Sequence, residues 1–247
     1  YRLIDLDALQ LDNNALPDLL NAAERMGFTG LNITFPCKQT ILPLLDELSP
    51  EARGIGAVNT VVLKDGKRIG HNTDCLGFAE GFRRGLSGAA LQRVVQMGAG
   101  GAGSAVAHAL LSEGVQHLEI FDVDSDRAQS LADNLNQHFE GHRAHAGKDL
   151  PAAMSATSGL VNTTPVGMAK LPGMPVPAHL LRAELWVAEI VYFPLQTELL
   201  QAARALGCRT LDGGNMAVFQ AVKAFELISG VTPDASRMLA HFQEMNG

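Results

Sequence analysis

The sequence predicts an α/β protein with two domains, an N-terminal α/β domain and a C-terminal Rossmann domain with a doubly wound sheet. Two observations support this fold class. From about residue 91 onward, short apolar runs typical of buried strands alternate with helical patterns, as in a parallel sheet with right-handed crossovers. Before residue 87 the patterns include a hairpin signal instead, and Ser87-Gly88 marks a boundary between the two regions.

The composition argues against several function classes. The 247 residues carry a net charge of -7 with scattered Lys and Arg, which argues against a nucleic-acid partner. No apolar run reaches the length of a membrane span and no signal peptide is visible, so we expect no membrane partner. The 3 cysteines lack the spacing of a metal site and favour a reduced compartment, so we expect a cytoplasmic protein without a metal centre.

The N-terminal half contains a hairpin signal and several helical patterns. Residues 1–6 resemble a strand inside a fold although the chain begins at Tyr1, so we expect further residues upstream. Lys64-Asp65-Gly66-Lys67 is typical of a hairpin turn between two strands. Thr73 or Asp74 is expected to cap the helix that follows. Helices are expected over 13–26, 37–45 and 75–86, with a short turn after Ser49-Pro50, and strands over 29–34, 57–63 and 68–71.

The C-terminal half shows the alternation of strands and helices most clearly. An irregular loop with three prolines, residues 169–177, interrupts it. Strands are expected over 94–97, 118–121, 158–161, 185–191 and 208–211, and helices over 104–111, 125–138, 195–206, 216–229 and 233–245.

Three glycines follow the first of these strands. Gly98, Gly100 and Gly103 form the G-x-G-x-x-G pattern between a strand and a helix, which is the context that a dinucleotide site requires. Gly98 permits a tight turn, Gly100 leaves room for a pyrophosphate, and Gly103 lets the helix pack close to the strand. The N-terminus of that helix then favours a phosphate. The simpler alternative is a structural strand-to-helix turn without a ligand.

An acidic residue after the second strand of this region favours NAD over NADP. Asp122 occupies the place from which an acid accepts hydrogen bonds from the ribose hydroxyls. Asp124 and Asp126 follow, and we interpret both as the start of the next helix, where acids suit the helix dipole. Arg127 weakens the preference somewhat, because its guanidinium can reach the adenine or a phosphate.

Three polar clusters interrupt the apolar pattern of the first half. They are residues 32–39, 56–60 and 72–74, and each follows or closes a strand, so all three are expected to converge at one edge of a sheet. Lys38 and Asp74 would form a proton-transfer pair if they met beside a nicotinamide. By spacing alone, a solvated helical Lys38 and a capping Asp74 are somewhat better interpretations than a proton-transfer pair.

Together these segments resemble the shikimate/quinate dehydrogenase family over nearly the whole chain. The matching segments are 30–38 (G-x-N-[IV]-T-x-P-x-K), 56–60 (G-A-V-N-T), 70–74 (G-x-N-T-D), 98–102 (G-A-G-G-A), 191–200 (V-Y-x-P-x-x-T-x-L-L) and 212–216 (D-G-x-x-M), followed by Gln220-Ala221. The resemblance implies a substrate-binding domain over 1–86, which the last helix (231–247) rejoins, an NAD-binding Rossmann domain over 87–230, and an active site in the cleft between them.

The resemblance also implies a reaction and its site. A ring hydroxyl is oxidised reversibly, interconverting shikimate and 3-dehydroshikimate or quinate and 3-dehydroquinate, as in the shikimate pathway of aromatic amino acid biosynthesis. Lys38 would transfer the proton or stabilise negative charge on the hydroxyl oxygen, and Asp74 would hydrogen-bond the same hydroxyl. The implied substrate-binding residues are Thr34, Asn59, Tyr192 and Gln220. The implied cofactor-binding residues are Gly98, Ala99, Gly100, Gly101, Ala102, Gly103, Asp122, Arg127, Thr163, Pro165, Val191, Gly214 and Met216.

The chain departs from the family pattern in three places. NADP-using members resemble N-R-T-x-x-R after the second Rossmann strand, and Val123 stands at the first Arg position, which points to the NAD-preferring quinate/shikimate branch. Pro165 replaces a Ser of the family's N-A-T-S-x-G-M. The Ser-rich loop that holds the substrate carboxylate in the family has no counterpart in these residues. The choice between quinate and shikimate therefore stays open.

Two other functions remain possible at this point. The chain could be a dehydrogenase of a related cyclitol such as aminoshikimate, or a regulator that binds the ligand without turnover. The intact Lys38 and Asp74 argue against the regulator. As partners we expect a polyol carboxylate substrate, and a chain that is a monomer or homodimer.

Overall fold

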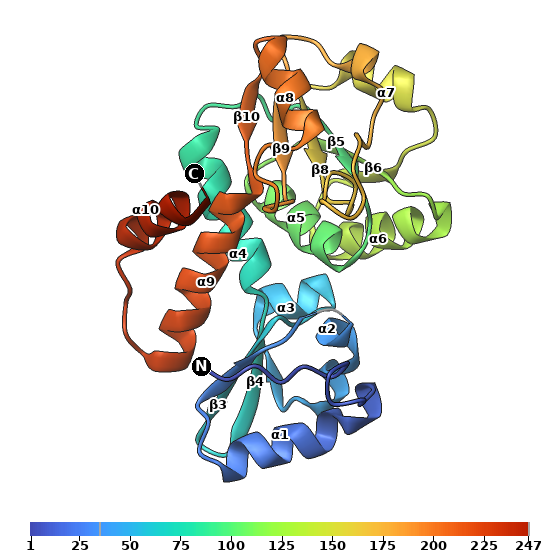
Figure 1. The fold of residues 1–247 in the computed structure, drawn as a ribbon. Helices are drawn as coiled ribbons and strands as arrows, with labels where there is room; N and C mark the ends of the chain where they lie inside the picture. Colours follow the sequence, from blue (N-terminus) through green and yellow to red (C-terminus); the bar gives the residue numbers. More distant parts are fainter. Residues whose placement is uncertain (35, 247) are drawn as a thin grey trace. The chain divides into compact units, whose positions relative to one another are not determined.

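The computed structural model describes residues 1–34 and 36–246, so that Phe35 and Gly247, the last residue of the predicted C-terminal helix, lie outside the described residues. The chain divides into two compact units (Figure 1). Unit 1 contains Tyr1–Asn72 and Ala224–Val231, and unit 2 contains Thr73–Lys223 and Thr232–Gly247. No helix in the described parts of the chain is long and apolar enough to cross a membrane.

The division differs from the predicted domain boundaries. Helix α4 (Thr73–Gly85) groups with unit 2 because it packs along α5 (Gly101–Ser112) and against β10 (Arg209–Leu211). Helix α10 (Ala235–Asn246) also groups with unit 2, whereas the end of α9 (Gly213–Ser229) groups with unit 1. The assignment of a substrate domain and a cofactor domain to 1–86 with 231–247 and to 87–230 therefore stays a prediction.

Unit 1 contains a mixed sheet of four strands. The strands β1 (Gly30–Asn32), β2 (Glu47–Leu48), β3 (Thr60–Lys64) and β4 (Lys67–His71) lie in the order β1-β3-β4-β2. The predicted hairpin between β3 and β4 is confirmed. Asp65 and Gly66 both have positive φ, 53° and 73°, as a type I′ turn requires, and Lys64 pairs with Lys67. The sequence did not predict β2, which has only two residues.

Short helices cover this sheet. They are η1 (Asn13–Ala15), α1 (Leu16–Arg25), α2 (Cys37–Thr40), η2 (Leu42–Leu44) and α3 (Pro50–Ile55). Leu16, Leu20 and Ala23 are the buried residues of α1, at the spacing of one helix face. The predicted single helix over 37–45 is interrupted, because Pro43 cannot donate a backbone hydrogen bond in a helix interior.

The prediction of a strand over residues 1–6 is wrong. The structure assigns no strand there, and residues 1–5 are exposed. Strands form where a neighbouring strand takes up their backbone hydrogen bonds, and the register of β1, the edge strand of this sheet, shows pairing with β3 alone.

Unit 2 contains a parallel sheet of six strands. These are β5 (Arg93–Met97), β6 (His117–Phe121), β7 (Ala144–Ala146), β8 (Gly159–Asn162), β9 (Trp186–Glu189) and β10, in the order β10-β9-β8-β5-β6-β7. In chain order within this unit, that arrangement is 6-5-4-1-2-3, the order of a Rossmann fold. The predicted doubly wound domain is thereby confirmed, although β7 and helix α7 were not predicted.

Helices and apolar residues complete unit 2. α5 lies beside α6 (Ser125–His138), as Figure 1 shows. The remaining helices are α7 (Leu150–Ala156), η3 (Ala178–Leu180) and α8 (Glu198–Ala205). A buried cluster joins neighbouring strands to α8 through Leu160, Val187, Leu199 and Leu200. Because β5 and β8 are neighbours whose following segments run to opposite ends of the strand order, ligands are expected at their carboxyl ends.

Candidate functional site

Steric requirements explain two glycines of the loop after β5. Gly98 has φ 101°, a conformation that suits glycine, and its N–H donates to the Phe121 carbonyl at 2.6 Å. A Cβ at Gly103 would lie 2.5 Å from the Gly98 carbonyl oxygen. The tight turn at Gly98 and the close packing at Gly103 therefore agree with the prediction for these positions.

The other glycines of the loop leave space that fits a dinucleotide. A Cβ at Gly100 or at Gly101 would meet no atom within 4 Å. Gly100 is the N-cap of α5, so the first backbone N–H groups of a 12-residue helix lie beside this open space. The residues present therefore fit a pyrophosphate, which needs both close approach to the backbone and hydrogen-bond donors.

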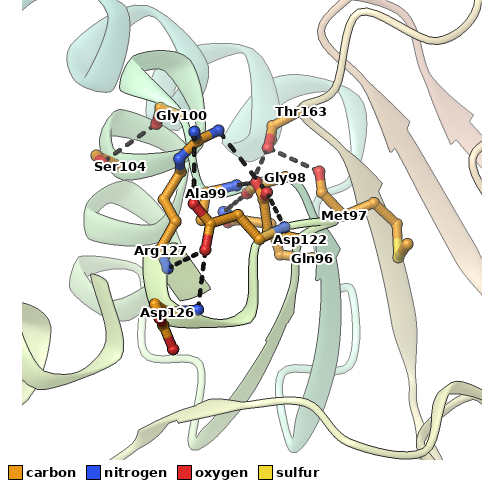
Figure 2. A network of polar contacts seen from close by, with 11 residues as sticks. Gln96, Met97, Gly98, Ala99, Gly100, Ser104, Asp122, Asp126, Arg127 and Thr163 are labelled. Carbon is orange, nitrogen blue, oxygen red and sulfur yellow. Dashed lines mark hydrogen bonds and ion pairs between the residues drawn. The ribbon is translucent and has the colours of Figure 1, made fainter. Parts of the chain in front are cut away.

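Two buried side chains hold this loop (Figure 2). The Gln96 amide donates to the carbonyls of Gly98, at 2.8 Å, and Gly103, at 3.0 Å. The Thr163 hydroxyl, from the loop after β8, lies 2.8 Å from the Met97 carbonyl and 2.9 Å from the Gly98 carbonyl. The sequence reasoning missed Gln96. Its signal is a polar residue inside the apolar run of β5, where a buried amide needs partners.

Asp122 lies against the same loop at the end of β6. Its carboxylate accepts from the Ala99 N–H at 2.7 Å and from the Asp124 N–H at 3.0 Å, and the Arg127 guanidinium lies 3.7 Å from it. Figure 2 shows the contacts of Asp122 with Ala99 and Arg127. A carboxylate has about four lone-pair sites, so Asp122 can accept further donors. Asp124 caps α6 by accepting from the N–H groups of Asp126 and Arg127, as interpreted from the sequence. Val123 is fully exposed.

The ends of β8 and β9 carry a buried polar cluster. Glu189, the last residue of β9, is only 1% exposed, and Asn162 is completely buried beside it. Burial raises the pKa of Glu189 to about 7, although hydrogen bonds from Asn162, Val191, Ile190 and Thr197 oppose the rise. Thr163 and Pro165 follow Asn162, and Val191 follows Glu189. Val191 is buried, whereas Tyr192 is 56% exposed. The sequence reasoning missed Glu189 as a candidate.

Helices α4 and α9 approach closely in unit 2. A Cβ at Gly77 would lie 2.5 Å from the Gln220 backbone nitrogen, so glycine permits this contact. The Thr73 hydroxyl lies 3.5 Å from the Gln220 side-chain oxygen. Asp74 is buried in the first turn of α4. α4 begins at Thr73, so neither Thr73 nor Asp74 is its N-cap residue as predicted; both lie in the first turn.

Gly214 and Met216 lie in the first turn of α9. The Gly214 N–H donates to the Asp212 carboxylate at 3.0 Å. A Cβ at Gly214 would lie 2.7 Å from the ring of Phe242 on α10. Met216 is buried.

Two of the three polar clusters, 32–39 and 56–60, meet in unit 1 together with Asn72, whereas Thr73 and Asp74 of the third cluster group with unit 2. The Ile33 N–H donates to the Asn59 carbonyl at 2.7 Å, and the Asn59 N–H donates to the His71 carbonyl at 3.1 Å. The Val58 N–H donates to the Lys38 carbonyl at 2.8 Å. The Asn72 amide donates to the Ala57 carbonyl at 3.0 Å. The ends of β1, β3 and β4 therefore form one hydrogen-bonded group.

The candidate side chains of this group differ in exposure. Asn59 is buried, Lys38 on α2 is half-buried, and Thr34 is exposed. The structure thus groups Thr34, Lys38 and Asn59 in unit 1, whereas it places Asp74 and the remaining candidates in unit 2.

Comparison with known proteins identifies relatives along nearly the whole chain. Residues 3–61 match the family described as the shikimate dehydrogenase substrate binding domain. The chain is 57% identical over 249 residues to a shikimate dehydrogenase (NADP(+)) of Streptomyces avermitilis, with 100% of this chain and 86% of the relative covered. It is 50% identical over 246 residues to a quinate/shikimate dehydrogenase (NAD(+)) of Corynebacterium glutamicum strain R, with 98% and 87% covered.

A solved structure has the same fold. Quinate dehydrogenase from Corynebacterium glutamicum in complex with NAD matches with a TM-score of 0.90 and 49% identity, over 95% of this chain and 83% of that chain.

Proposed function

The chain belongs to the shikimate dehydrogenase family, and we propose that it interconverts shikimate and 3-dehydroshikimate, or quinate and 3-dehydroquinate, with NAD as the redox cofactor. The observation that carries the proposal is the combination of two groups of residues. One is the glycine loop of unit 2, whose open N-terminus fits a pyrophosphate. The other is the hydrogen-bonded group of polar strand ends in unit 1, which carries a lysine.

Oxidation of a secondary hydroxyl removes a hydride from carbon and a proton from oxygen. NAD supplies the acceptor for the hydride when it is bound. The proton needs a group of the chain, and we assign Lys38 to that task because a lysine amine can accept the hydroxyl proton and return it in the reverse reaction. We assign Asp74 to accept the hydrogen bond of that hydroxyl in the bound substrate, which orients the hydroxyl before its single proton passes to Lys38.

The other polar candidates fit the binding of a polyol. Asn59 and Gln220 carry amides that can donate to and accept from ring hydroxyls, and Thr34 and Tyr192 carry hydroxyls. A polyol supplies the hydrogen-bond partners that such groups need when a ligand excludes water from them. We therefore assign these four residues to the substrate.

The cofactor residues follow from the geometry of unit 2. We assign the backbone of residues 98–103 and the start of α5 to the pyrophosphate, and Asp122 with Arg127 to the adenosine half. Thr163, Pro165 and Val191 follow β8 and β9 at the carboxyl edge of the sheet, and we assign them to the nicotinamide half together with Gly214 and Met216.

The preference for NAD over NADP is a finer proposal. It rests on the buried carboxylate of Asp122, which would repel a ribose phosphate, and on the exposed Val123 where NADP-using members carry Arg. The relatives include both an NADP(+) and an NAD(+) enzyme, so the chain's own residues carry this assignment.

The reaction is proposed to take place in the cytoplasm, which is compatible with three cysteines that form no disulfide in the described chain. The oligomeric state, monomer or homodimer, stays a prediction.

One experiment tests both halves of the proposal. Steady-state rates are measured with quinate and with shikimate, each with NAD and with NADP, by the absorbance of the reduced nicotinamide. We expect turnover of at least one of the two polyols, with a larger kcat/KM for NAD. Turnover of neither polyol would exclude the proposed substrates, and a panel of cyclitols including aminoshikimate would then test the second candidate. Ligand binding without turnover of any compound would favour the regulator.

A further inference from the structure

Glu189 is a buried acidic residue to which the proposed reaction assigns no role. It ends β9, is 1% exposed, and is surrounded by uncharged groups. A buried carboxylate costs free energy unless hydrogen bonds compensate for the water that it has lost. Its partners therefore indicate what the residue stabilises.

The carboxylate connects three segments at the carboxyl edge of the sheet. The Asn162 amide, from the end of β8, lies 3.0 Å from both of its oxygens. The backbone N–H groups of Ile190 and Val191 both donate to Oε1 at 3.0 Å. The Thr197 hydroxyl, at the N-cap of α8, lies 3.3 Å from Oε2. One side chain thus holds the segment after β8, the segment after β9 and the start of α8.

Asn162 extends this network along the segment after β8. Its amide nitrogen donates to the Val166 carbonyl at 2.9 Å as well as to Glu189, and its amide oxygen accepts from the Thr164 N–H at 3.0 Å and hydroxyl at 2.7 Å. Every neighbour of the amide matches its donor or acceptor side, so the orientation of the amide is determined by its surroundings. The loop from Asn162 to Val166 is therefore fixed through the Glu189 carboxylate.

We propose that Glu189 is a positioning residue, whose carboxylate holds the loops after β8 and β9 in the conformation that binds the nicotinamide half of the cofactor. The inference rests on the proposed function, because that function assigns Thr163, Pro165 and Val191 to the cofactor. The partners of Glu189 in this network are uncharged, so the carboxylate acts through backbone and amide geometry.

Protonation of Glu189 is expected to weaken this network. Protonation turns one carboxyl oxygen into a donor and reduces the number of bonds that it can accept, so a protonated Oε2 can no longer accept from both Asn162 and Thr197. The groups that face the carboxyl are Asn162 from β8, Ile190 and Val191 after β9, and Thr197 from α8, and none of them titrates. A pH dependence of cofactor binding near the pKa of about 7 would therefore report on Glu189.

The test compares Glu189→Gln with Glu189→Asp and with the control Glu119→Gln. Glu119 lies on β6 of the same sheet, and burial also raises the pKa of its carboxyl, but the Glu189 network does not include it. The Kd of NAD is measured by calorimetry below and above pH 7, together with Tm and with kcat and KM for the polyol. NAD binding needs no turnover, so the titration decides the inference even if both polyols fail as substrates.

We expect Glu189→Gln to raise the Kd of NAD about tenfold, the effect of roughly one lost charge-assisted hydrogen bond. The amide also puts an N–H₂ donor in front of Asn162. In the unmodified protein the Kd of NAD should rise as the pH falls through about 7, and Glu189→Gln should remove this dependence. Glu189→Asp should recover part of the affinity, and Glu119→Gln should change neither the Kd nor its pH profile.

Two results would overturn the inference. One is a Glu189→Gln protein that binds NAD with unchanged Kd, even if its Tm falls, since this would show a purely structural role. The other is a pH-independent Kd of NAD in the unmodified protein, a measurement that stays decisive if the variants do not fold. A protein that binds no dinucleotide at all would overturn both the inference and the proposed function.

Discussion

In unit 1, backbone hydrogen bonds hold the segments that carry the polar side chains, whereas in unit 2 buried side chains hold a backbone loop. The carbonyls of Lys38 and Asn59 accept backbone hydrogen bonds from Val58 and Ile33, so backbone groups fix the position of both residues. In unit 2, by contrast, the side chains of Gln96 and Thr163 donate hydrogen bonds to carbonyls of the glycine loop and so hold its backbone. Substitution of Lys38 should therefore change chemistry, whereas substitutions around the glycine loop should change binding or folding.

The largest effect is expected from Lys38→Ala. The variant removes the proposed proton-transfer group but keeps the Lys38 carbonyl that accepts from Val58. Turnover should fall by about 10²–10⁴-fold, the usual contribution of a positioned acid or base. The Tm and the Kd of NAD should stay as they are. Lys64→Ala, an exposed lysine at the hairpin of the same unit, is the control and should keep full activity. Full activity of Lys38→Ala would refute the proposed role.

The pH dependence of stability should show that the ionised carboxylate of Glu189 destabilises the folded chain, because it is buried in unit 2. Its pKa is about 7 in the folded chain and about 4.5 when unfolded, so folding favours the protonated form. The contribution of protonated Glu189 to the stability of the folded chain is fully present below pH 4.5 and is lost as the pH rises through about 7. At about 1.4 kcal/mol per pH unit, the free energy of unfolding should decrease by about 3 kcal/mol over this range.

Urea unfolding across this pH range, with Glu189→Gln beside the unmodified protein, measures the contribution. The variant lacks the titrating group, so its stability should depend less steeply on pH. If the free energy of unfolding depends on pH equally in the two proteins, Glu189 keeps an ordinary pKa in the folded chain. Burial of its charge would then not destabilise the fold.

Substitutions at two glycines of the loop should have different effects, one on stability and the other on the binding of NAD. The Cβ of Gly103→Ala would meet the backbone of Gly98, which cannot move away, so we expect a loss of about 1–3 kcal/mol in stability. Gly100→Ala would meet no atom within 4 Å and should cost less than about 1 kcal/mol. Its Kd for NAD should nevertheless rise, because the new methyl group would occupy the space assigned to the pyrophosphate. Thermal unfolding measures the effect on stability and calorimetry measures the Kd. An unchanged Kd of NAD for Gly100→Ala would show that the pyrophosphate does not bind beside Gly100.

The sequence predicted features that local patterns determine. The Asp65-Gly66 turn, the glycine loop and the helix start at Asp124 each depend on a few neighbouring residues, and all three are present. Strands β2 and β7, of two and three residues, are too short to show a periodicity. The strand expected at residues 1–6 failed because a strand also depends on a neighbour.

The buried polar network could not be predicted for a related reason. Gln96 and Glu189 lie inside apolar runs, where a strand pattern suggests only core packing. Their significance comes from partners far along the chain, since Thr163 lies 65 residues from Gly98 and Asn162 lies 27 residues from Glu189. Motif resemblance, by contrast, finds residues such as Lys38 whose role is chemical and whose neighbours in sequence are characteristic.

The smallest effect is expected from Asp122→Ala, which tests whether a side chain of unit 2 also contacts the ligand directly. The variant removes the acceptor for the Ala99 N–H and for the ribose hydroxyls of the proposed site. The Kd of NAD should rise about tenfold, which corresponds to about 1.4 kcal/mol of binding free energy. The difference between the Kd values of NAD and NADP should become smaller, because the carboxylate that repels the ribose phosphate of NADP is also lost. Asp126→Ala removes the same charge from an exposed position on α6 and is the control. If both variants change the ratio of the two Kd values equally, net charge rather than contact with the ribose sets the preference.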